Sequence, residues 1–182
     1  MKKGAAEREI LLVLRAQSGD RDALDALLAS AQEPLYRYVL SLVKERHAAE
    51  DVLQETFIRL YRKLGWLREP GLFRPWAYRV ATREAFRRLK RERRWAEQVR
   101  DEDALRALPA PPPPRGELSG ELSARLRDSV AALPPASRAA VVLYYLHEMS
   151  FEETAAVLGV PVGTVKSRLA YGLEALRRRL RE

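Results

Sequence analysis

The segment FEETAAVLGVPVGTVKSRL, residues 151–169, has the anatomy of two helices joined by a sharp turn. Ser150 precedes it and Glu153 follows three residues later, which is the spacing of a capping box at a helix start. Gly159 can take the positive φ that a sharp turn needs, and Pro161 fits the start of a second helix, where its missing N–H costs nothing. The segment therefore predicts a helix–turn–helix.

The second of these helices has two distinct faces. A stripe at helical spacing is expected to face the core, with Gly172 marking a close helix approach; it comprises Val165, Leu169, Gly172, Leu176 and Leu180. The opposite face carries Thr164, Lys166, Ser167, Arg168 and Tyr171. These residue types suit phosphate and base-edge contacts, and recognition helices read bases with their N-terminal turns. An ordinary solvated helix face is the alternative, but the capping box and the glycine–proline turn favour binding to duplex DNA.

A second basic segment, LFRPWAYRVATREAFRRLKRERR, spans residues 72–94 and holds nine Lys or Arg against two Glu. Aromatic residues are interleaved with the cations, and Trp66 lies just upstream. Bases stack on aromatic rings while cations hold phosphates, so this composition is typical of single-stranded nucleic-acid binding. The helical spacing of Phe73 and Trp76 favours burial of those two rings in the core. A charge density this high favours a polyanionic partner for the exposed remainder.

The helix expected over residues 48–64 also divides into two faces. Its apolar stripe is formed by Leu53, Phe57, Leu60 and Leu64. A separate face carries Asp51, Gln54, Glu55, Ile58 and Arg62. The helical pattern does not explain why the apolar Ile58 stands on this otherwise polar face.

A break in composition divides the chain. Residues 101–120, DEDALRALPAPPPPRGELSG, hold an acidic cluster and a proline run, which predict an extended spacer. Apolar residues recur every three or four positions on both sides, so we expect an all-α fold of two small helical domains. The expected parts are an N-terminal helical domain at 1–97, a flexible acidic and Pro-rich linker at 98–118, and a helix–turn–helix domain at 119–182. Expected helices cover 8–17, 21–30, 34–44, 48–64 and 72–96, then 121–133, Pro135 to Leu146, a helix after Ser150, and a last helix ending near Leu180.

Composition narrows the function classes. The 182 residues carry a formal net charge of +8, which favours nucleic acid or an anionic surface as partner. The chain has no cysteine, and its two histidines, His47 and His147, lie far apart, so we expect no metal site, no cofactor and no catalytic residues. The longest apolar run, AAVVLYYL at 139–146, is too short to span a membrane, and we expect a cytoplasmic protein without membrane insertion.

The ordered set of segments resembles an extracytoplasmic-function (ECF) sigma factor of bacterial RNA polymerase. AEDVLQETFIRLYRKL (49–64) is similar to the second conserved sigma region where it docks on the polymerase clamp. FRPWAYRVATREAFRRLKRERR (73–94) is similar to the part that recognises and melts the −10 element. LPPASRAAVVLYYLHEMSFEETAAVLGVPVGTVKSRL (133–169) is similar to the fourth region, which reads the −35 element. The resemblance covers nearly the whole chain, with a linker and no third region between the two parts.

The resemblance implies a promoter-specific initiation subunit and not an enzyme. It implies core-polymerase contacts at Asp51, Gln54, Glu55 and Ile58. It implies capture of the melted −10 strand by Trp66, Leu67, Arg74, Trp76, Arg79, Arg83 and Arg87. It implies −35 recognition by Thr164, Lys166, Ser167, Arg168 and Tyr171. The implied partners are the clamp coiled coil of the largest polymerase subunit, the flap of the second-largest subunit, duplex and single-stranded promoter DNA, and an anti-sigma factor.

Two departures from the family pattern bear on base preference. Arg83 stands where the family often has Asn, and Ala170 with Tyr171 stands where it often has a bulky residue followed by Arg. The alternative function is a helix–turn–helix transcriptional regulator that acts on duplex DNA without polymerase. Such a regulator often has a receiver-like half of alternating strands and helices, and the N-terminal sequence shows no such alternation. A nucleic-acid-processing enzyme would need carboxylates or histidines clustered near the basic face, whereas Asp and Glu are scattered.

Overall fold

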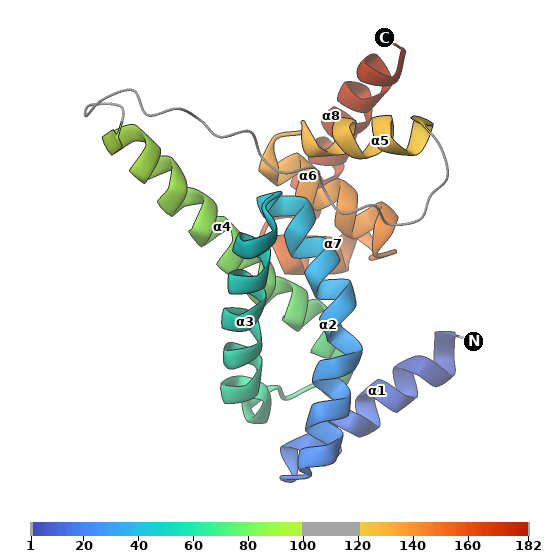
Figure 1. Cartoon of the computed structure of the whole chain (residues 1–182). Helices are drawn as coiled ribbons and strands as arrows, with labels where there is room; N and C mark the ends of the chain where they lie inside the picture. Colours follow the sequence, from blue (N-terminus) through green and yellow to red (C-terminus); the bar gives the residue numbers. More distant parts are fainter. Residues whose placement is uncertain (1, 100–120, 182) are drawn as a thin grey trace.

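The computed structural model describes residues 2–99 and 121–181, and all regular elements in those ranges are helical (Figure 1). The N-terminal part contains α1 (Lys2–Gln17), α2 (Arg21–Val43), α3 (Arg46–Lys63), the short helices η1 (Leu64–Trp66) and η2 (Pro70–Leu72), and α4 (Phe73–Val99). The C-terminal part contains α5 (Glu121–Ala131), α6 (Pro135–Val141), η3 (Val142–Leu146), α7 (Phe151–Leu158) and α8 (Val162–Arg181). The all-α expectation is confirmed.

The helix α2 is continuous, so the expectation of separate helices at 21–30 and 34–44 is wrong. Asp20 caps its start by accepting a hydrogen bond from the Ala23 N–H at 3.0 Å. The helix then runs through Pro34, although an interior proline costs about 3 kcal/mol. Beyond it, Leu35, Tyr38, Val39 and Leu42 are all fully buried. Burying each such side chain contributes roughly 1.5–3 kcal/mol, which outweighs the proline.

The N-terminal core lies between α2, α3 and α4, which pack against one another. Tyr38 of α2 is fully buried, and its hydroxyl lies 2.7 Å from Thr82 Oγ1 on α4. Phe73 is buried at the start of α4, as the sequence predicted, while Trp76 is half-buried beside it with ring centroids 6.2 Å apart. This core fixes α4 along its first half and leaves its outer face open to solvent.

The C-terminal part has its own core between α6, α7 and α8. Leu133, Ala140, Val165 and Leu169 are buried in it. The helix expected to continue to Leu146 changes at Val142 into a π-helical turn, in which the His147 N–H donates to the Val142 carbonyl at 3.1 Å. Helices α5 and α8 pack together on the far side of this core.

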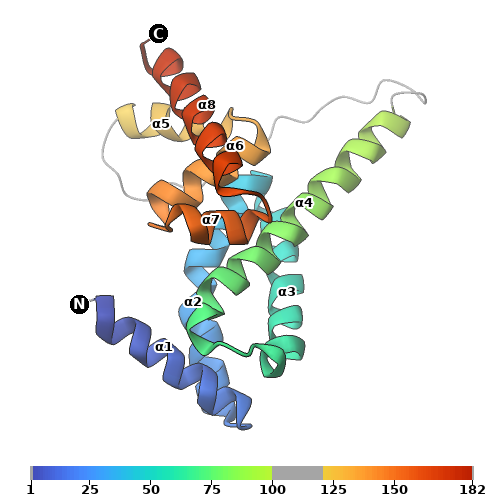
Figure 2. The same ribbon diagram turned by 180° about the vertical axis from the view of Figure 1, so that it is seen from behind.

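The two helical parts are packed against each other. Helix α7 lies against α4, and α6 lies against α2, as the two opposite views agree (Figures 1 and 2). Leu143, Met149 and Val157 of the C-terminal part belong to the same buried apolar cluster as Leu42 and Ala81 of the N-terminal part. The expected acidic and proline-rich spacer, at 101–120, lies outside the described residues.

Candidate nucleic-acid interface

The helix–turn–helix forms as the sequence predicts. Ser150 Oγ accepts from the Glu153 N–H at 3.0 Å, and Glu153 Oε2 accepts from the Ser150 N–H at 2.8 Å, which completes the capping box. Gly159 ends α7 in the left-handed region with φ of 65°. Pro161 lies just before α8, and its carbonyl accepts from the Thr164 and Val165 N–H groups. These contacts set the angle at which α8 leaves the turn.

The buried side of α8 is also as predicted. Val165, Leu169 and Leu176 are buried, and Leu180 is half-buried. A Cβ placed on Gly172 would lie 2.7 Å from Val141 Cγ2, so only glycine permits this approach of α8 to α6. The close packing turns the opposite side of α8 outward.

The outward side carries the residues expected to contact DNA. Lys166, Ser167 and Tyr171 are exposed, Tyr171 by 53%, and Thr164 and Arg168 are half-buried. Ser167 Oγ donates to the Thr164 carbonyl at 3.0 Å, which leaves the hydroxyl oxygen able to accept. Lys166 Nζ lies 5.4 Å from the Phe151 ring centroid, so a cation–π contact links α8 to α7. All five side chains therefore lie in the first half of α8, where a groove-reading helix presents its contacts.

The loop before α4 is held by α1, through a residue that the sequence analysis missed. Gln17 Nε2 donates to the carbonyls of Leu64 at 2.9 Å and Leu67 at 2.8 Å. Trp66 lies between these anchors and is 78% exposed, with Lys63 Nζ 6.0 Å from its ring centroid. The loop thus presents a large aromatic ring to solvent beside a cation, while Leu67 is half-buried. A lone Gln at a helix end carries no sequence signal for such a role.

Along α4 the expected contact residues form one stripe. Trp76, Arg79, Arg83 and Arg87 are spaced by three or four residues, which places them on one face of a helix. Arg79, Arg83 and Arg87 are exposed and Trp76 is half-buried. The stripe begins close to the loop that carries Trp66, because η2 leads directly into α4.

Two of the arginines expected to contact the −10 strand, Arg87 and Arg74, already have partners within the chain. Arg87 pairs with Glu84, whose side chain is only 8% exposed and also lies 2.8 Å from Arg59 Nε on α3. Arg74 donates from Nη2 to the His147 carbonyl at 2.5 Å, so its guanidinium reaches the C-terminal part of the chain. The structure therefore brings Arg79 and Arg83 to the surface and turns Arg74 toward the contact between the two parts.

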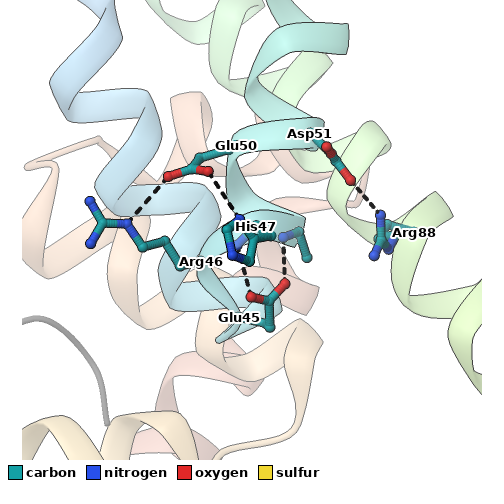
Figure 3. A network of polar contacts seen from close by, with 7 residues as sticks. Glu45, Arg46, His47, Glu50, Asp51 and Arg88 are labelled. Carbon is teal, nitrogen blue, oxygen red and sulfur yellow. Dashed lines mark hydrogen bonds and ion pairs between the residues drawn. The ribbon is translucent and has the colours of Figure 1, made fainter. Parts of the chain in front are cut away.

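The polar face of α3 is exposed as expected. Asp51, Gln54, Glu55 and Ile58 are all exposed, and Asp51 Oδ2 lies 3.1 Å from Arg88 Nη1 on α4 (Figure 3). At the start of the helix, Glu45 accepts from the backbone N–H groups of Ala48 and His47, and these hydrogen bonds lower the pKa of its carboxyl (Figure 3). On α4, hydrogen bonds from Arg88 to Glu92 and Asp51 raise the pKa of its guanidinium above the ordinary value.

Within residues 2–99 and 121–181, no group of three or more His, Cys, Asp or Glu could hold a metal ion. No helix in that part of the chain is long and apolar enough to cross a membrane.

The comparisons with known proteins agree with this geometry. Residues 27–95 match the family model for sigma-70 region 2, and residues 123–176 match the model for sigma-70 region 4. The chain is 34% identical to the RNA polymerase sigma-H factor of Pseudomonas aeruginosa, over 93% of this chain and 92% of that protein. It is 30% identical to the ECF RNA polymerase sigma factor SigW of Bacillus subtilis, over 93% of this chain and 95% of that protein.

A solved structure with similar architecture is that of CnrH in complex with the cytosolic domain of CnrY. It has a TM-score of 0.70 and 26% sequence identity, and it covers 95% of this chain and 97% of that chain. Region 2 falls on α2 to α4, where the Trp66 loop and the arginine stripe lie, and region 4 falls on α5 to α8, which include the helix–turn–helix. The chain belongs to the ECF sigma factors of bacterial RNA polymerase.

Proposed function

We propose that this sigma factor divides promoter recognition between two exposed helices. Helix α8 reads the −35 duplex through Thr164, Lys166, Ser167, Arg168 and Tyr171. Helix α4 and the loop before it hold the melted −10 non-template strand through Trp66, Leu67, Arg74, Trp76, Arg79, Arg83 and Arg87. The observation that carries the proposal is the exposure of two separate basic faces, one on each part of the chain, with Trp66 beside the α4 face.

The chemistry of the two faces supports this division. An exposed indole beside exposed arginines can stack an unpaired base while the guanidinium groups hold the backbone. The first turns of α8 offer a lysine, two hydroxyl-bearing side chains and an arginine, which can donate to phosphates and base edges. Flipping a base costs a few kcal/mol, which stacking on Trp66 would offset.

The same proposal assigns the polymerase contacts. Asp51, Gln54, Glu55 and Ile58 on α3 bind the clamp coiled coil of the largest polymerase subunit, and the C-terminal domain binds the flap of the second-largest subunit. The functional boundaries are 1–97 for polymerase binding and −10 recognition, 98–118 for the linker, and 119–182 for −35 recognition. The protein works in the cytoplasm with its polymerase, and an anti-sigma factor controls it. Sigma factors are non-enzymatic subunits, so the chain supplies no catalytic residue.

Run-off transcription with purified core polymerase and a promoter library tests the proposal. Replacing both Arg168 and Tyr171 with Ala should lower initiation from promoters that depend on the −35 element by about 30-fold or more, because each of the two lost base contacts costs about 1–3 kcal/mol. Core binding, measured by fluorescence anisotropy of the labelled protein, should be unchanged. Replacing Gln54 and Glu55 with Ala should instead weaken core binding and reduce initiation from all promoters equally.

The two pairs of substitutions serve as controls for each other. If both pairs reduce core binding and promoter selectivity alike, the division of labour is wrong. If the protein binds duplex DNA tightly alone and gains nothing from core polymerase, it acts as a helix–turn–helix regulator. The region 2 match over residues 27–95 favours the sigma function over that alternative, because a regulator of duplex DNA needs no polymerase-docking domain.

A further inference from the structure

One side chain of α1 holds the loop that carries Trp66 at two points. Gln17 Nε2 donates to the carbonyls of Leu64 at 2.9 Å and Leu67 at 2.8 Å, which lie on either side of Gly65 and Trp66. Both partners are acceptors, so the carboxamide must present its NH2 group, which has two hydrogens to donate. A single nitrogen therefore ties together the start and the end of the short turn that contains the exposed indole.

The position of Gln17 is fixed by the junction between α1 and α2. Gln17 is the last residue of α1, and two residues before it Arg15 Nη2 lies 2.6 Å from Asp20 Oδ2. Asp20 in turn caps the start of α2. The far end of the loop also meets α1, because a Cβ placed on Gly71 would lie 3.7 Å from Ile10 Cδ1. Helix α1 is thus a fixed support for both ends of the loop.

The indole ring of Trp66 depends on this support for its direction. The side chain is 78% exposed, so packing against the protein does little to orient it. Lys63 Nζ lies 6.0 Å from the ring centroid, which is the outer limit of a cation–π contact. The Leu67 N–H donates to the Leu64 carbonyl at 3.0 Å, a bond that closes one short turn. The direction of the ring therefore follows the backbone between Leu64 and Leu67, which Gln17 holds.

A ring held in place before the DNA arrives binds an unpaired base more tightly than a mobile ring. A loop that adopts the binding geometry for only part of the time loses affinity in proportion to that fraction. Taking a base out of the stack already costs free energy, which leaves little to spend on ordering the loop. This advantage applies to the melted strand alone, because the contacts of α8 with duplex DNA and of α3 with polymerase do not involve the loop.

We propose that Gln17 is a positioning residue of the −10 site, which holds the carbonyls of Leu64 and Leu67 so that the Trp66 ring is already oriented to stack an unpaired base. Gln17 acts through Trp66 and not by contacting DNA. The inference rests on the proposed capture of the melted strand by Trp66. It makes α1 a working part of the −10 site, although α1 precedes residues 27–95, which match sigma-70 region 2.

A double-mutant cycle on holoenzyme binding to promoter DNA pre-melted at the −10 element tests the inference. Gln17→Glu keeps the size of the side chain but replaces the NH2 donor with an oxygen, which repels the two carbonyls. Trp66→Ala should weaken binding by about 5- to 150-fold, the equivalent of about 1–3 kcal/mol for one stacked base. Gln17→Glu should lose part of that affinity alone, and should lose nothing further in the Trp66→Ala background, because both changes act on one contact.

Two further variants and a measurement without DNA keep the test decisive. Gln17→Met removes the donor without adding charge and should behave like Gln17→Glu. Gln32→Glu makes the same chemical change at an exposed residue of α2 and should leave DNA binding unchanged. In the free protein, hydrogen–deuterium exchange of residues 64–72 should be faster in both Gln17 variants than in the wild type. Circular dichroism checks that each variant is folded, and core-polymerase affinity should be the same in all of them.

Two results would overturn the positioning role while leaving the proposed function intact. Unchanged exchange of residues 64–72 in both Gln17 variants would show that Gln17 does not hold the loop. An equal loss of DNA affinity from Gln17→Glu with and without Trp66 would show that Gln17 does not act through the indole. Full DNA affinity in Trp66→Ala would instead contradict the capture of a base by Trp66, which is the proposed function, and the inference would fall with it.

Discussion

His147 lies on the C-terminal domain, but two tyrosines of the N-terminal domain surround its ring. Burial, together with the smaller effect of the nearby positive charge of Arg74, lowers the pKa of His147 to about 4. The same burial raises the pKa of Tyr78 to about 12, so its hydroxyl stays protonated at neutral pH. The docked interface therefore requires a neutral imidazole.

Docking should weaken as the pH falls from about 6.5 to about 4. An exposed histidine titrates near 6.5, so in this window the undocked state binds more protons than the docked state, and protons favour undocking. Above about 6.5 both states hold a neutral imidazole and the full stabilisation is present. Energy transfer between labels on Ala29→Cys and Glu174→Cys, measured against pH in the free protein, checks this expectation.

The control is His147→Gln, which should flatten the pH profile. The other groups that face this contact are Tyr38 on α2, Arg74 and Tyr78 on α4, and Glu9 on α1. Burial raises the pKa of Glu9, so the folded protein binds its proton more readily and acid favours that arrangement. An unchanged pH profile in His147→Gln would assign the dependence to a group other than the imidazole.

At the scale of elements, helix ends depend on neighbouring residues, whereas the packing of helices depends on residues far away in the sequence. Asp20, Ser150 and Gly159 mark helix ends in the structure through local hydrogen bonds or backbone conformation, and the roles of Ser150 and Gly159 are those predicted from the sequence. Pro34 carries an equally local signal, yet α2 passes through it because the residues that follow are buried against α3 and α4. A capping signal needs only its own neighbours, whereas the outcome at Pro34 depends on distant helices.

Gly172→Ala should destabilise the C-terminal domain. The new methyl group would lie 2.7 Å from Val141 Cγ2, and Val141 is itself buried, so the contact cannot relax freely. Overpacking costs about 1–3 kcal/mol, while the better helix propensity of Ala returns about 1 kcal/mol. We expect a net loss of about 1 kcal/mol in the free energy of unfolding, measured by urea denaturation.

Gly163→Ala is the matched control on the same helix. A Cβ at Gly163 would meet nothing within 4 Å, so this substitution should leave stability unchanged or raise it slightly. Equal stability of the two variants would contradict the close approach of α8 to α6.

At the scale of the whole molecule, the positively charged side chains should not all contribute equally to DNA binding. The net charge of +8 favours polyanions in general, but only unpaired surface cations release counterions from DNA when they bind. Arg79 and Arg83 are exposed on the α4 stripe, whereas Arg87 is already paired with Glu84. Contributions to DNA binding should differ accordingly.

Arg79→Gln and Arg83→Gln should each reduce the salt dependence of binding to melted promoter DNA. Neutralising one phosphate of a single strand contributes about 0.7 to the slope of log affinity against log salt concentration, so each substitution should lower the slope by about that amount. Arg87→Gln should lower it less. The measurement is a salt titration of holoenzyme binding to DNA pre-melted at the −10 element.

Arg37→Gln, which removes an exposed arginine already paired with Glu33, controls for the change in net charge. An equal loss of slope in this variant would mean that the overall charge matters more than the α4 stripe.

The sequence by itself determined the all-helical fold, the helix–turn–helix, its buried stripe and the exposure of Lys166 and Tyr171, but not the continuity of α2 through Pro34. Caps, turns and helical periodicity depend on residues a few positions apart, so they can be predicted from the sequence. Only the tertiary structure decided that Gln17 holds the Trp66 loop, that Glu84 pairs with Arg59 of α3, and that Arg138 and His147 dock onto α2 and α4. These contacts join residues far apart in the chain, and an apolar or charged side chain does not specify which distant surface it will meet.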